Sequence, residues 1–282
     1  MADTGTHPEQ AYASPSSNSY VAPRRYGAVN WLGLQTLYVR EVRRFLKVGM
    51  QTLFAPVLSA LLFMLVFKLA FPDRPPIDGV SFADFLGPGV VMMAVLNNAF
   101  QNSSSSITIA KVQGNTSDFL MAPLSSSELT AGFIAGAATR GVLVGAVTLA
   151  VIAAMGVASV SVVHWWAVIF YSLIAAIFMG AVGLLGGVWA EKFDHLAVVT
   201  NFVILPLTML SGTFYPIDAL GEPFRSLSNF NPFFHLIDGF RYGFTGNAEG
   251  DLMFGASFTF IIAAASTIAC WALFRSGYKL KA

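Results

Sequence analysis

The sequence contains few charged residues. Asp, Glu, Lys and Arg make up 11% of its 282 residues, whereas hydrophobic residues make up 55%. An ordinary soluble domain carries roughly 25% charged residues, so this composition excludes a soluble globular protein. The net charge is only +1, and the basic residues flank the apolar runs, which argues against a nucleic-acid-binding surface. The composition therefore predicts a protein that crosses a membrane several times.

The sequence also lacks the residues that several kinds of site require. Cys270 is the single cysteine, so no internal disulfide can form. The four histidines, His7, His164, His195 and His235, show neither an HExxH pattern nor a paired spacing, and we predict no metal site. No GxxxxGK(S/T) phosphate-binding loop occurs. We therefore predict no ATP hydrolysis by that route and no catalytic residue in this chain.

Six apolar runs are long enough to cross a membrane, since a spanning helix needs about 20 apolar residues. We expect spans at residues 51–71, 85–110, 132–158, 165–190, 196–214 and 252–274. Glycines three or four residues apart in the third and fourth runs permit close helix packing. The predicted fold class is an all-α membrane protein with six transmembrane helices.

Two segments precede the first span. Residues 1–27 are rich in Ser, Pro, Thr, Gly and Ala, and we expect a disordered cytoplasmic tail. Residues 30–47 predict an amphipathic helix that lies along the membrane surface. Basic residues occupy the other faces of this helix. Its apolar residues recur at helical spacing and are Trp31, Leu34, Tyr38, Val42 and Phe45. The alternative is a soluble helix that packs against the rest of the protein.

The second predicted span becomes polar halfway along its length. One side of this helix carries a polar stripe of Asn97, Asn98, Gln101, Asn102, Ser105 and Thr108. Polar side chains avoid acyl chains, so we expect the stripe to face another helix or a polar route through the membrane.

A polar segment separates the second and third spans. Gly114 and Pro123 bound a short predicted helix that carries Asp118, Phe119 and Leu120. Ser125 or Ser126 can cap the next helix, with Glu128 at or near its third position as in a capping box.

These landmarks resemble those of the type 2 permeases of ATP-binding cassette exporters, the ABC-2 family. Members carry a segment with Gly-Thr, an acidic residue and Leu, followed by Pro-Leu-Ser and another acidic residue. Gly114, Asp118, Leu120, the run 123–125 and Glu128 match it, although Asn115 stands directly after the glycine. A second set of family landmarks follows at 205–207, 211–216, 231–232 and 238–242. The resemblance covers residues 28–282 as one ABC-2 type transmembrane domain and is strongest to the bacterial branch with YadH-like and nodulation-type permeases.

The resemblance implies a permease subunit without an ATPase site of its own. Such a subunit moves a large amphiphile, such as a drug, a lipid-linked glycan or a lipo-oligosaccharide, out across the inner membrane. The implied assembly is a homodimer with two copies of a separate ATPase, which would bind ATP and Mg, so no cofactor is expected in this chain. The central segment would be the cytoplasmic coupling helix that docks into the ATPase, through Gly114, Asp118, Phe119, Leu120, Pro123 and Glu128. The alternative is an ion-coupled secondary carrier or a channel, which would want titratable groups at the bilayer midplane.

The candidate substrate pathway comprises Asn97, Asn98, Gln101, Asn102 and Arg140. Arg140 is the strong charge within the third span, about two turns from its expected cytoplasmic end. One interpretation is that it snorkels to the interface or pairs with Glu128 or Glu191. The other is that its guanidinium lines the inner mouth and attracts an anionic headgroup.

The distribution of Lys and Arg predicts the orientation. With the amino terminus inside, eleven of the 16 basic residues are cytoplasmic, three (Arg74, Arg225 and Arg241) are outside, and Lys68 and Arg140 lie within spans. We therefore expect both termini and residues 111–132 in the cytoplasm of a multi-pass inner-membrane protein, with 72–84 and 216–250 outside. Residues 215–251 are aromatic but broken by Pro and Gly, and we expect short re-entrant helices there, with Asp238 and Arg241 forming a local ion pair.

Overall fold

The computed structural model describes residues 27–71, 74–77 and 79–279. All but one residue of the expected tail at 1–27 lies outside the described residues. Within the described part of the chain the regular elements are helices, and β-structure is limited to one isolated bridge between Ile77 and Val80. The all-helical class predicted from the sequence is confirmed for these residues.

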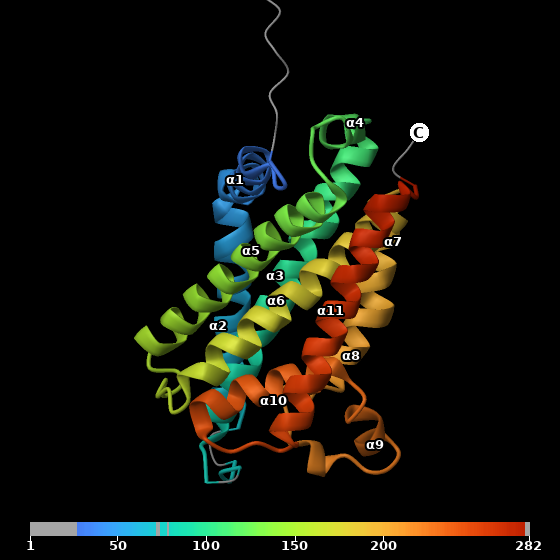
Figure 1. Cartoon of the computed structure of the whole chain (residues 1–282). Coiled ribbons are helices and arrows are strands. Elements are labelled where there is room, and N and C mark those ends of the chain that lie inside the picture. Colours follow the sequence, from blue (N-terminus) through green and yellow to red (C-terminus); the bar gives the residue numbers. More distant parts are fainter. Residues whose placement is uncertain (1–26, 72–73, 78, 280–282) are drawn as a thin grey trace, which may run out of the picture.

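The helices follow one another with short connections (Figure 1). They are α1 (Trp31–Lys47), the π-helical segment η1 (Met50–Phe54), α2 (Ala55–Ala70), α3 (Phe82–Val112), α4 (Thr116–Leu120), α5 (Ser126–Ala154), α6 (Trp165–Trp189), α7 (Phe193–Val199), the π-helical segment η2 (Thr200–Ile204), α8 (Leu205–Met209), the short 3-10 helix η3 (Ile217–Ala219), α9 (Phe224–Ser228), α10 (Pro232–Thr245) and α11 (Leu252–Ser276).

Five helices are long and apolar enough to cross a membrane, judged by length and composition: Met50–Ala70, α3, α5, α6 and α11. The span expected at 196–214 is a shorter helical stretch, Phe193–Met209, built from α7, η2 and α8. It ends before residue 214 because Gly212 adopts a left-handed φ of 67° and the Ser211 hydroxyl bonds back to the carbonyl of Thr208. Five of the six expected spans are thus confirmed as apolar helices of sufficient length, and the sixth stays a prediction.

Helix α3 is the centre of the bundle. Its most apolar 18-residue window is 72% buried, against 17% for the first candidate span, so α3 packs on all sides whereas α2 lies at the edge. Helix α6 approaches α3 closely because two glycines face it. A Cβ on Gly183 would lie 2.4 Å from the Phe100 carbonyl oxygen, and one on Gly187 would lie 2.9 Å from that of Ser104. The small-residue packing expected in the fourth span is therefore directed at α3.

The two ends of the bundle are formed by different elements (Figure 1). Helices α1 and α4 and the last residues of α11 lie at one end. The connection after α2 and helices α9 and α10 lie at the opposite end. This arrangement matches the predicted grouping of segments, although which end faces the cytoplasm stays a prediction.

Helix α1 packs against the protein along one stripe. Leu37, Glu41 and Phe45 are buried, and Tyr38 hydrogen-bonds Thr139 of α5 at 3.0 Å. Trp31, expected on the apolar face, is 72% exposed. The alternative of a helix packed on the rest of the chain therefore holds for the Leu37 stripe, and residence at the membrane surface stays a prediction.

The short helices between residues 215 and 251 are present, but the expected pair within them is wrong. Arg241 forms its ion pair with Glu249, at 2.8 Å, rather than with Asp238. The Asp238 carboxylate instead accepts the backbone N–H groups of Glu249 and Gly250, each at 2.9 Å. The loop after α10 folds back and brings a second carboxylate, which spacing along one helix cannot reveal.

Candidate functional site

The central polar segment forms the bounded helix that the sequence predicts. Gly114 ends α3 with a left-handed φ of 71°, and the N–H of Asn115 then donates to the Ala110 carbonyl at 2.8 Å. Helix α4 follows over five residues, Thr116–Leu120. Ser125 caps α5, and its reciprocal capping box with Glu128 confirms that prediction.

Glu128 does more than cap α5. Its carboxylate accepts the N–H of Ser125 at 2.6 Å and also the N–H of Asn30 at the start of α1. The Asn30 amide in turn donates to the Pro123 carbonyl at 2.9 Å. Glu128 and Asn30 thus join α1, the central segment and α5 into one unit. Asn30 could not be recognised from the sequence, because its partners lie more than ninety positions away.

The face that α4 presents to solvent differs from the expected one. Phe119, expected to be an apolar anchor for a partner, is 2% exposed and packs edge-on against Phe133 of α5, with 5.6 Å between the ring centroids. Asp118 and Met121 are exposed, and Leu120 is half-buried. Phe119 therefore fixes α4 on α5, and the solvent-facing surface of this segment is that of Asp118, Leu120 and Met121.

A groove of about 1070 Å³ opens between α2, α3 and the stretch from α7 to α8. Four of the expected pathway residues line it: Asn97, Asn98, Gln101 and Arg140. The rest of its wall is largely apolar and comes from α2 and from residues near Met209 and Phe214. The groove is at the upper end of the volume that binds drug-sized molecules, which is typically about 300–1,000 Å³.

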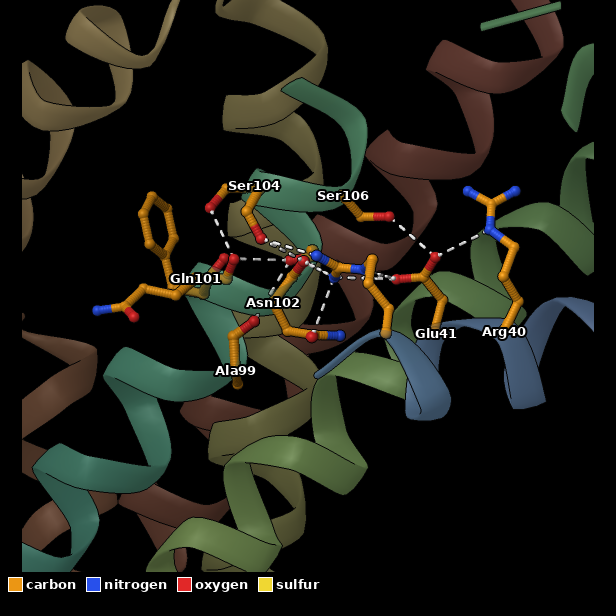
Figure 2. Close-up of polar contacts among 11 residues, drawn as sticks. Arg40, Glu41, Ala99, Gln101, Asn102, Ser104 and Ser106 are labelled. Carbon is orange, nitrogen blue, oxygen red and sulfur yellow. Dashed lines mark hydrogen bonds and ion pairs between the residues drawn. The ribbon is translucent and has the colours of Figure 1, made fainter. Parts of the chain in front are cut away.

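Asn102, also expected in the pathway, lies outside the groove. Its backbone carbonyl and side-chain oxygen both accept from the Arg44 guanidinium of α1, at 2.6 and 3.0 Å. At 100° per residue, one extra position along α3 turns its side chain away from Gln101. Figure 2 shows the Gln101 side chain pointing away from Glu41, while Asn102 and Ser106 point toward it.

A buried carboxylate organises this second cluster. Glu41 of α1 is 0% exposed and accepts the Ser106 hydroxyl at 2.9 Å, and Arg44 donates to it at 3.1 Å (Figure 2). Arg40 approaches Oε1, the oxygen that also accepts Ser106, at 3.7 Å, whereas Arg44 donates to Oε2. We missed this residue from the sequence. The available signal was an acidic residue at i+4 from Leu37 and i−4 from Phe45, within the stripe that becomes buried.

Arg140 lies farther from the start of its helix than expected. Helix α5 starts at Ser126, six residues before the predicted span, which places Arg140 about 21 Å along the helix axis. The guanidinium is 7% exposed and donates to the Asn98 side-chain oxygen at 3.1 Å. The expected pairing with Glu128 or Glu191 is wrong, because Glu128 caps α5 and Glu191 pairs with Lys279 at 3.3 Å.

Comparison with known proteins fits this geometry. The family model described as ABC-2 type transporter matches residues 33–245, which is most of the chain. The chain belongs to the ABC-2 type transporter family.

This ABC-2 chain is similar to several curated proteins. It is 34% identical over 254 residues to the inner membrane transport permease YadH of Escherichia coli K12, which covers 89% of this chain and 98% of that protein. It is 27% identical over 166 residues to nodulation protein J of Rhizobium leguminosarum bv. viciae, covering 57% of this chain and 62% of that one. Nodulation protein J of Sinorhizobium fredii is 26% identical over 227 residues, with 76% and 83% covered. The predicted family and its branch are confirmed.

In this ABC-2 permease, α5 connects the two candidate sites. Its first turn holds the central segment through Ser125 and Glu128, and its middle carries Arg140 at the groove. One continuous helix of 29 residues therefore links the central segment to the groove.

Proposed function

We propose that this chain is the membrane-spanning permease subunit of an ATP-driven exporter. It moves a large amphiphile, such as a drug, a lipid-linked glycan or a lipo-oligosaccharide, out across the bacterial inner membrane. Membership of the ABC-2 family and similarity to a protein named inner membrane transport permease support this proposal. The observation that carries it is the joining of a large groove to an exposed coupling segment by one rigid helix, α5.

The energy comes from a separate ATPase. Two permease copies pair as a homodimer and each engages one ATPase subunit, which binds ATP and Mg, so this chain holds no cofactor. Asp118, Leu120 and Met121 form the docking surface, with Asp118 at the polar edge of the contact and the two apolar side chains inside it. Phe119 and Glu128 keep this surface fixed to α5 and α1.

Both termini and α4 face the cytoplasm in this proposal. The grouping of α1, α4 and the end of α11 at one end of the bundle supports it, as does the excess of Lys and Arg in these segments. The short helices α9 and α10 then lie at the outer end.

The test uses the permease and its ATPase reconstituted in membranes. Asp118→Lys together with Leu120→Ala should uncouple ATP hydrolysis from export, because the charge reversal and the truncation remove the polar and apolar parts of one contact. We expect export to fall at least about tenfold, the loss that a hot-spot contact typically carries. Asp218→Lys is the control, since it reverses an exposed acid at the opposite end of the bundle.

Unchanged export and unchanged substrate-stimulated ATP hydrolysis in the α4 variant would contradict the assignment of α4 as the coupling helix. An ion-coupled carrier would then be the better hypothesis. Equal loss in both variants would also count against it, because the effect would not be specific to the docking surface.

A further inference from the structure

Arg140 is a buried cation in the wall of the groove. Among the residues that the structure describes, no carboxylate lies within 4.0 Å of its guanidinium. The Glu41 carboxylate, on the neighbouring α1, is already shared by Arg40 and Arg44. Buried charges in proteins are normally paired because desolvation of a lone ion is costly. The Arg140 side of the groove therefore carries an uncompensated positive charge.

The guanidinium also has an unused donor. The Nε atom of Arg140 is buried and has no hydrogen-bond partner, while Nη2 donates to Asn98. The Asn98 amide nitrogen is itself occupied by the Ala94 carbonyl, at 3.0 Å. Guanidinium donors match the geometry of a carboxylate, sulfate or phosphate group, and Arg140 has one without a partner.

The wall beyond this charge is apolar. Helix α2 contributes Ala60 and Phe63 to the groove, and Met209 and Phe214 face it from the other side. One part of the groove thus offers Arg140, amides and hydroxyls, together with Arg44, whose charge is paired with Glu41, and the remainder offers a largely apolar surface for hydrocarbon. A molecule that fits both is charged negatively at one end and apolar at the other.

We propose that the groove binds an anionic amphiphile, with its acidic head on Arg140 and Gln101 and its apolar part along α2 and Phe214. The claim that this amphiphile is the exported substrate rests on the proposed function. Its binding does not, because it can be measured on the purified chain without ATP, an ATPase or transport. The head is recognised by its negative charge, so phosphate, sulfate and carboxylate heads all qualify.

The test titrates the delipidated full chain in neutral detergent with two lipids of identical acyl chains, and native mass spectrometry counts the bound molecules. Wild type should bind phosphatidylglycerol about tenfold more tightly than phosphatidylcholine, the factor that one charge-assisted hydrogen bond supplies. Arg140→Gln should remove this preference, and Arg140→Lys should retain most of it. Arg43→Gln is the matched control, since it removes one exposed positive charge from α1 outside the groove.

Several outcomes would overturn the proposal. Equal affinity of wild type for the two lipids would do so without any variant, and it is the result expected if a carboxylate of a second copy neutralises Arg140. An equal effect of Arg43→Gln and Arg140→Gln would assign the preference to the general surface charge. Inorganic phosphate that displaces phosphatidylglycerol at equal concentration would show a small-anion site without an apolar part. If lipid binding follows Arg140 but reconstituted export is absent, the export function fails and the site stands.

Discussion

Among the residues that the structure describes, two arginines are buried, and their surroundings differ. Arg241 of α10 is 3% exposed, and all three of its guanidinium nitrogens have partners: the Phe85 carbonyl at 3.2 Å, Glu249 at 2.8 Å and the Gly212 carbonyl at 2.6 Å. Its guanidinium also lies 3.8 Å from the Phe85 ring centroid. Arg140 is equally buried but has one side-chain acceptor, Asn98, and an open groove beside it.

The difference in partners distinguishes Arg241, whose charge holds the fold together, from Arg140, whose charge can bind a ligand in the groove. Arg241 joins α3, α10, the turn at Gly212 and the loop at Glu249, so its partners are part of the fold. Arg140 contacts α3 through a single amide and leaves a donor open. Burial alone therefore does not report function, and the number of satisfied donors distinguishes the two residues.

The largest expected effect on stability comes from removing Arg241, whose hydrogen bonds are all made within the fold. Arg241→Gln should lower the free energy of unfolding by about 3 kcal/mol at pH 8, because it leaves the Glu249 carboxylate and two buried carbonyls without their donor. Arg140→Gln should change it by less than about 1 kcal/mol, since no carboxylate depends on it. Thermal unfolding in detergent, followed by tryptophan fluorescence, measures both.

The control for this prediction is the double variant with Arg241→Gln and Glu249→Gln. It should recover part of the lost stability, because it removes the buried carboxylate as well as its partner. An Arg140→Gln variant that unfolds as easily as Arg241→Gln would contradict the distinction between the two arginines.

The sequence predicted the course of the chain better than its polar contacts. The long apolar runs, the helix between Gly114 and Pro123 and the Ser125–Glu128 capping box depend on residues close together in sequence, and the structure contains them. The helical stretch Phe193–Met209 has 17 residues and ends earlier than predicted because the chain makes a left-handed turn at Gly212. A single Gly within an apolar run is too weak a signal to predict that a helix ends there.

The polar contacts that were missed are long-range. Glu249 meets Arg241 because a loop folds back, and Glu41 meets Ser106 across 65 positions. The polar stripe of α3 was recognised from its period, but one helix faces several neighbours. Asn98 and Asn102 lie one turn apart and still contact α5 and α1, respectively. Such assignments need the packing of the whole bundle.

A smaller effect should separate these two asparagines. Asn98→Leu should reduce export about tenfold while the protein still inserts, because it removes the acceptor that orients Arg140 in the groove. Asn102→Leu should act on stability, by about 1 kcal/mol, since Arg44 loses one of its acceptors on α3. Export by reconstituted protein and thermal unfolding are measured for both variants. Equal export in the Asn98→Leu variant and wild type would assign that side chain to helix packing alone.

The last prediction concerns the pH response of the Arg241–Glu249 pair. Burial raises the pKa of Glu249 to about 7 from its usual 4.5, although the Arg241 charge and the Ile217 N–H oppose this shift. The folded protein therefore holds the Glu249 proton more tightly than the unfolded chain does. The stabilisation from this group is complete below pH 4.5 and is lost as the pH rises to about 7. Glu249→Gln cannot titrate, so its melting temperature should fall less than that of wild type across this interval. The difference should be roughly 6 °C, because a pKa raised from 4.5 to about 7 corresponds to about 3 kcal/mol. Parallel pH profiles for the two proteins would show that Glu249 does not titrate there, and that its ion pair with Arg241 stays charged throughout.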